Sequence, residues 1–67
     1  MTNDMNYKDA LQSQLTIANM LAPNGNAQQR IVRMVSEMER NGESYSDILV
    51  QVILWIALCL RNQNWPE

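Results

Sequence analysis

Apolar side chains recur every three or four residues early in the chain, at Leu11, Leu15, Ala18 and Leu21. This spacing places them on one side of a helix with about 3.6 residues per turn. It predicts an amphipathic helix over about residues 7–21, with Asn6 as its N-cap. Pro23 should end this helix, because proline lacks an N–H donor and disfavours helical conformation in the residue before it.

A second apolar stripe follows, made up of Ala27, Ile31, Met34, Val35 and Met38. It predicts a second helix over about residues 27–40, with Asn26 as its N-cap. The pair Asn24-Gly25 before it predicts a tight turn of the kind that tolerates positive φ. Gly42 should end the second helix, because glycine readily adopts the left-handed conformation common at helix C-termini.

The third pattern is the almost continuously apolar run Ile48–Leu60, in which Gln51 alone is polar. The sequence Ser44-Tyr45-Ser46-Asp47 is typical of a helix start, so this helix should cover about residues 45–62. Three helices with short loops predict an all-α, three-helix antiparallel bundle. We expect a single small domain, 1–67, with residues 1–5 and 63–67 as frayed tails.

A helix that is apolar on nearly every side must be enclosed on nearly every side. The rest of this 67-residue chain offers only two modest amphipathic helices and short tails for that purpose. Small domains with marginal cores rely on disulfides, metal or oligomerisation, but Cys59 is the only cysteine and there is no histidine. We therefore expect a homodimer or higher oligomer formed through the third helix.

One stripe of the third helix is polar at both ends and apolar in the middle, and comprises Asp47, Gln51, Trp55, Leu58 and Asn62. We predict that the oligomer or partner interface is made up of Gln51, Trp55 and Leu58 from this stripe, together with Ile48 and Val52. Tryptophan is enriched in binding hot spots, which favours an interface. The alternative is that Trp55 and Leu58 pack beneath the first helix or the C-terminal tail. Gln51 either meets its copy and fixes register or is solvated.

The apolar run is short for a membrane span. Thirteen helical residues rise about 20 Å, whereas the hydrocarbon core of a bilayer is about 30 Å thick. Trp55 also lies near the middle of the run, away from the interface where aromatic side chains gather. The polar N-terminus is unlike a signal peptide, and a lone cysteine fits a reducing compartment. We expect a cytoplasmic protein without a membrane partner.

Candidate chemistry is sparse. The chain has no histidine, which is the usual general base near neutral pH. The thiol of Cys59 lies within the apolar run, where burial would make it unreactive. Glu37 and Glu39 point to different sides of a helix, and Glu43 with Asp47 fits the acidic bias of a helix start. We expect no enzyme, no metal site and no cofactor.

One polar group remains as a candidate binding face, at Gln28, Gln29, Arg30 and Arg33. Amide and guanidinium side chains can bind base edges, so a helix-turn-helix-like DNA-binding regulator using helix 27–40 is one alternative. The net charge of −2 opposes it, and a solvated face with Arg33–Glu37 and Glu37–Arg40 pairs is favoured. Another alternative is an oligomer that sequesters a nucleotide or other small anion with Arg30, Arg33, Lys8 or Tyr7.

The function expected from these patterns is that of a small non-enzymatic interaction protein. It would act as a homo-oligomer that binds and masks, inhibits or chaperones another macromolecule, most simply a protein. This expectation depends on the surplus of apolar surface and the scarcity of catalytic groups. The sequence does not identify the partner.

Overall fold

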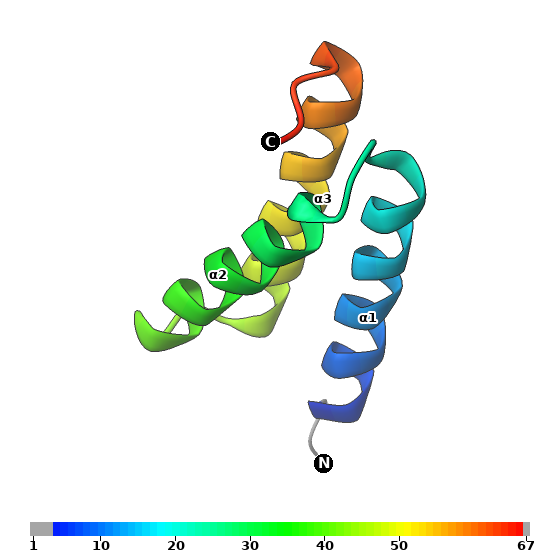
Figure 1. Ribbon diagram of the computed structural model, residues 1–67. Coiled ribbons are helices and arrows are strands. Elements are labelled where there is room, and N and C mark those ends of the chain that lie inside the picture. The colour runs from blue at the N-terminus through cyan, green and yellow to red at the C-terminus, as the bar shows by residue number, and fades with distance from the viewer. Residues whose placement is uncertain (1–3, 67) are drawn as a thin grey trace.

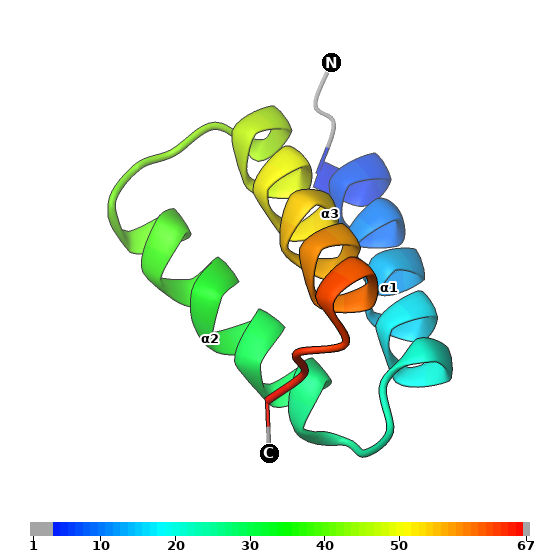
Figure 2. The same cartoon turned by 90° about the horizontal axis from the view of Figure 1, so that it is seen from above.

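The computed structural model describes the backbone of residues 4–66 and the side chains of residues 6–66. It contains the helices α1 (Asp4–Leu21), α2 (Asn26–Arg40) and α3 (Tyr45–Asn62). Helices α1 and α3 run in the same direction and α2 in the opposite one (Figures 1 and 2). Each helix packs against both others. The predicted all-α, three-helix bundle is confirmed.

The first helix begins earlier than predicted. It starts at Asp4, so Asn6 lies inside its first turn and the prediction that Asn6 is the N-cap is wrong. Of the five residues expected to fray, residues 1–3 lie outside the described part, and the two that follow are helical. The helix ends at Leu21, two residues before Pro23, as the proline predicts.

The connection between α1 and α2 differs from the prediction in its turn. Gly25 has a φ of −81°, so it does not use the positive φ expected there. Instead the Asn24 Oδ1 atom accepts a hydrogen bond from the Asn26 N–H at 2.9 Å. This bond is a side-chain mimic of a backbone turn, and it bends the chain with ordinary dihedral angles. The helix begins at Asn26, so the prediction that Asn26 caps it is also wrong.

The connection between α2 and α3 follows the sequence signals. Gly42 has a φ of +80°, and the N–H of Glu43 donates to the Met38 carbonyl at 3.1 Å. This is the bond of a Schellman motif, which requires a residue able to adopt positive φ. Ser44 then caps α3, because its Oγ atom accepts a hydrogen bond from the Asp47 N–H at 3.2 Å. The predicted stop and start are both confirmed.

The hydrophobic core lies where the three helices meet. Its buried members are Tyr7, Ala18, Ala27, Ile31, Val35, Met38, Ile48, Val52 and Ile56. The largest fully buried side chains are Ile31, Ile48 and Val52. Two of these, Ile48 and Val52, come from the inner side of α3, so one side of that helix is buried in the core.

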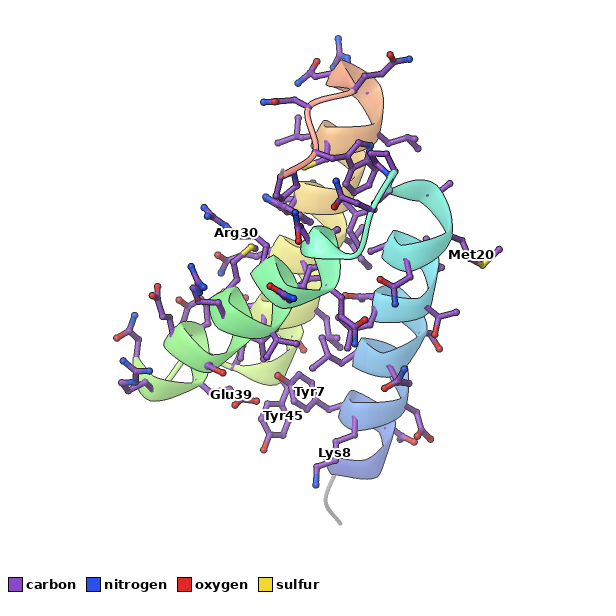
Figure 3. All side chains as sticks on the ribbon, in the orientation of Figure 1. Tyr7, Lys8, Met20, Arg30, Glu39 and Tyr45 are labelled. Atoms are coloured by element: carbon purple, nitrogen blue, oxygen red, sulfur yellow. The ribbon has the colours of Figure 1, made fainter. Side chains whose placement is uncertain are left out.

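A cluster of polar and aromatic side chains joins the three helices near the start of α1 (Figure 3). The ring of Tyr7 stacks on the ring of Tyr45, with 4.0 Å between centroids and 10° between planes. The Tyr7 hydroxyl donates a hydrogen bond to the Glu39 Oε2 atom at 2.9 Å. Tyr7 therefore ties α1 to both α2 and α3 and fixes the register of the parallel pair α1 and α3.

This cluster should make the fold sensitive to alkaline pH. Burial, the hydrogen bond to Glu39 and its negative charge raise the pKa of Tyr7 from 10.0 to about 12. The native state therefore keeps a proton that the unfolded chain releases near pH 10.0. The contribution of Tyr7 to stability is complete below that pH and is lost as the pH rises toward about 12. Urea titrations should show that the free energy of unfolding falls over this pH range in wild type and Tyr45→Phe but not in Tyr7→Phe. An equal fall in wild type and Tyr7→Phe would contradict the prediction.

A buried glutamine in α1 is a second test of the packing. Gln14 is 8% exposed, and its Oε1 atom has no hydrogen-bond partner among the described residues. Gln14→Met keeps a long, flexible side chain of similar size and removes this unsatisfied acceptor, so it should stabilise the protein by about 1 kcal/mol. The melting temperature should therefore rise by about 4–8 °C. Gln12→Met, at an exposed position of the same helix, is the control; an equal or lower melting temperature for Gln14→Met would refute the prediction.

Candidate interaction surface

The side of α3 that faces away from the bundle remains apolar. Its exposed side chains, called the outer face below, are Val50, Ile53, Leu54, Ala57, Leu58 and Leu60. The five larger ones keep between 48% and 55% of their surface exposed. No charged residue interrupts the outer face between Val50 and Leu60. Such a contiguous apolar surface is typical of a site of association.

The orientation of α3 explains which residues reach this surface. Ile48, Val52, Ile56 and Cys59 are its buried residues, and they share one side at helical spacing. The opposite side is centred on Val50, Leu54 and Ala57. It lies about a quarter turn from the stripe through Gln51 that the sequence suggested.

The outer face continues onto α1. Ala10 of α1 lies with Leu49 of α3 around one shallow hollow. Ile17 and Leu21 follow Ala10 at intervals of seven and four residues, so they share its side of α1. These two side chains are 48% and 43% exposed. The apolar surface therefore spans the seam between α1 and α3, on the side away from α2.

The five residues predicted at the interface do not share one environment in the structure. Ile48 and Val52 are fully buried inside the protomer, so they have no surface to offer a partner and are not retained in the interface proposed below. Gln51 is exposed, but its Nε2 atom donates to the Glu43 Oε1 atom at 2.6 Å in the same chain. Leu58 is 54% exposed and belongs to the outer face.

Trp55, the fifth residue, packs within the protomer. Its ring meets the ring of Trp65 edge to face, with 6.1 Å between centroids and 82° between planes. The chain leaves α3 through Gln63, which adopts a left-handed conformation with a φ of 51°. This turn brings Trp65 back over the helix. For Trp55, packing beneath the C-terminal segment is therefore the arrangement that the structure has.

Three of the four residues of the predicted polar face, Gln28, Gln29 and Arg33, line one hollow on α2, and Arg30 lines a second hollow with Arg33. Gln28 faces α1, where its Oε1 atom accepts a hydrogen bond from the Asn19 Nδ2 atom at 2.9 Å. Arg30 lies at the opposite edge of α2, in a hollow of about 360 Å³ that Trp55 and Trp65 also line. Gln29 and Arg33 are exposed between these edges. The expected Arg33–Glu37 and Glu37–Arg40 ion pairs are not formed within the described chain.

The four side chains considered for anion binding lie in two separate places within one chain. Tyr7 and Lys8 lie near Glu39, at the end of α2, whereas Arg30 lies in its first half (Figure 3). Tyr7 already donates its hydroxyl proton to Glu39. One protomer therefore does not bring these four residues around a common anion.

The only thiol is suited to packing. Cys59 is 7% exposed, and burial raises its pKa, an effect that the nearby charge of Arg30 partly opposes. A raised pKa leaves the sulfur protonated and unreactive at neutral pH. Among the described residues, no three acidic, cysteine or histidine side chains lie close enough together to hold a metal ion.

By length and composition alone, α3 is long and apolar enough to cross a membrane. Its 18 residues have a mean hydropathy of 1.3, and 22% of them are buried in the bundle. The core helix of a soluble protein passes the same test but is mostly buried, whereas most of α3 is not buried within one copy of the chain. In this fold α3 packs on α1 and α2, and both of those helices carry extensive polar surface.

Comparisons of the chain with protein-family models, curated proteins and solved structures find no match.

Proposed function

We propose that this protein is a small, non-catalytic interaction protein that acts as a homo-oligomer. The outer face of α3 joins the copies, and the assembled unit binds and masks, inhibits or chaperones a macromolecular partner in the cytoplasm. The observation that carries the proposal is the set of half-exposed apolar side chains on a helix whose other side is already in the core.

The free energy available from burying the outer face supports association. Burying a large apolar side chain completely is worth about 1.5–3 kcal/mol. Burying the remaining surface of a half-exposed side chain would therefore contribute about 1 kcal/mol. The outer face has five large side chains, each close to half exposed. Their burial would contribute about 5 kcal/mol from each copy, before the entropic cost of association. Native domains are stable by about 5–15 kcal/mol, so this surface represents a substantial part of the available stabilisation.

A second copy fits this surface better than a membrane does. If α3 crossed a bilayer, α1 and α2 would have to leave its inner side, breaking the contacts of Ile48 and Val52 and the Tyr7–Tyr45 stack. A helix lying on an anionic membrane usually has basic residues beside its apolar side. Here the chain carries a net charge of −2, and Arg61 is the only basic residue of α3.

The concentration dependence of thermal unfolding tests the self-association. Association stabilises the native state by mass action, so the melting temperature of wild type should rise with protein concentration. An unchanged melting temperature over a wide range of concentrations would contradict the proposal.

A capture experiment tests partner binding separately. We expect immobilised wild-type protein to retain a macromolecule from a lysate of its source cell. Leu54→Glu, which alters the outer face, should lose it, whereas Met20→Glu should keep it, because Met20 is 78% exposed on another part of the surface. A macromolecule retained equally by both variants, or none retained by wild type, would contradict this part of the proposal.

A further inference from the structure

Two opposite charges mark the ends of the outer face. Along α3, the residues Asp47, Val50, Leu54, Ala57 and Arg61 follow one another at intervals of three, four, three and four. This is the spacing of the contact seam between two packed helices. Asp47 lies in the first turn of α3 and Arg61 in the last. Within the described chain neither side chain forms an ion pair.

The helix dipole explains only part of this pattern. An acid near the start of a helix and a base near its end are both favourable for a single helix. The dipole does not require them to share a stripe, yet both charges lie on the side of α3 that carries Val50, Leu54 and Ala57. Leu54 is also the midpoint of the stripe, seven residues from each charge.

We propose that α3 packs antiparallel against α3 of a second copy, about a two-fold axis at Leu54. Asp47 of each copy then faces Arg61 of the other. The same axis places Val50 opposite Leu58, because each is four residues from Leu54. This inference rests on the self-association proposed above and adds the direction and register of the pairing.

The charges select the antiparallel direction. A parallel pair in register would place Asp47 against Asp47 and Arg61 against Arg61, which is repulsive at both ends. The antiparallel pair replaces both repulsions with attractions. A two-fold axis also closes the assembly at two copies, because each copy uses the same surface.

Site-directed cross-linking distinguishes the two directions. In a Cys59→Ala background, Asp47→Cys and Arg61→Cys proteins are prepared separately, mixed, and treated with a short bismaleimide. In the antiparallel pair, a cysteine at 47 lies beside one at 61 of the other copy and about 21 Å along the axis from its own equivalent. We expect a cross-linked dimer in the mixture only. Asp9→Cys, at an exposed position of α1, controls for random collision.

Each result has a distinct meaning. Cross-linking within each separate protein but no gain on mixing would indicate a parallel pair and overturn the inference. A dimeric wild type without cross-links in any sample would place the contact elsewhere and also overturn it, while leaving self-association intact. A monomeric wild type would overturn the proposed function itself. If that monomer also sedimented with phosphatidylcholine vesicles, the outer face would belong to a bilayer.

Charge exchange gives an independent measurement. Asp47→Arg and Arg61→Asp should each weaken dimerisation about fivefold, as expected for an exposed ion pair, and the double exchange should restore it. Circular dichroism of each variant establishes that α3 is folded. If the double variant shows only the summed losses of the two single variants, the proposed Asp47–Arg61 contact is refuted.

Discussion

Leu54→Glu should yield a folded protein that no longer self-associates. Leu54 is 55% exposed in the protomer, so an acidic side chain there can remain in water. In the proposed dimer the two Leu54 side chains meet at the axis, and the variant would place two carboxylates against each other. At about 1 kcal/mol for each half-exposed side chain, losing the two leucines alone costs about 2 kcal/mol per dimer, which weakens dimerisation about 30-fold, and the repulsion between the carboxylates weakens it further.

Sedimentation velocity and circular dichroism together test this prediction. Met20→Glu is the matched control, because it makes the same chemical change at a side chain that is 78% exposed and points away from the bundle (Figure 3). The control should sediment as wild type. Equal sedimentation of Leu54→Glu and wild type at concentrations where wild type is associated would show that Leu54 is outside the interface.

Ile48→Ala should instead destabilise the protomer. Ile48 has no exposed surface and packs in the core, so its truncation leaves a cavity. Such changes cost about 2–5 kcal/mol, a large part of the stability of so small a domain. We expect a strong fall in the urea midpoint and a melting temperature near or below ambient.

Ile53→Ala is the control for this prediction, since the same truncation falls at a side chain of α3 that is 52% exposed. Both changes are best measured in the Leu54→Glu background, where unfolding is not coupled to dissociation. Ile53→Ala should have little effect there. Similar losses for the two variants would mean that α3 does not have distinct inner and outer sides.

Local signals in the sequence determine most of this fold. The apolar spacing of the first two helices, Pro23, Gly42 and the serine cap before α3 each act within a few residues, so they are visible without tertiary structure. The errors are also local. Asn6 and Asn26 can both serve as caps, and only the surrounding packing and the bond from Asn26 to Asn24 decide where each helix begins.

The orientation of α3 was harder to predict because a helix that is apolar on every side has no clear amphipathic period. Gln51 is the one polar residue within the run Ile48–Leu60, so the interface predicted from the sequence is centred on it. In the structure Gln51 donates a hydrogen bond to Glu43. Trp55, on the same side of α3, lies beside Arg30 of α2 and Trp65 of the C-terminal segment. Asp47 and Arg61, each seven residues from Leu54, indicate which side of α3 remains exposed in the protomer.

Sedimentation equilibrium of the wild-type protein tests the central claim most directly. If the outer face of α3 joins two copies, the mass at high concentration should be twice the 7.7 kDa of the chain and should fall toward 7.7 kDa on dilution. A mass of 7.7 kDa at every concentration would contradict the account, because the apolar side chains from Val50 to Leu60 would then remain in water.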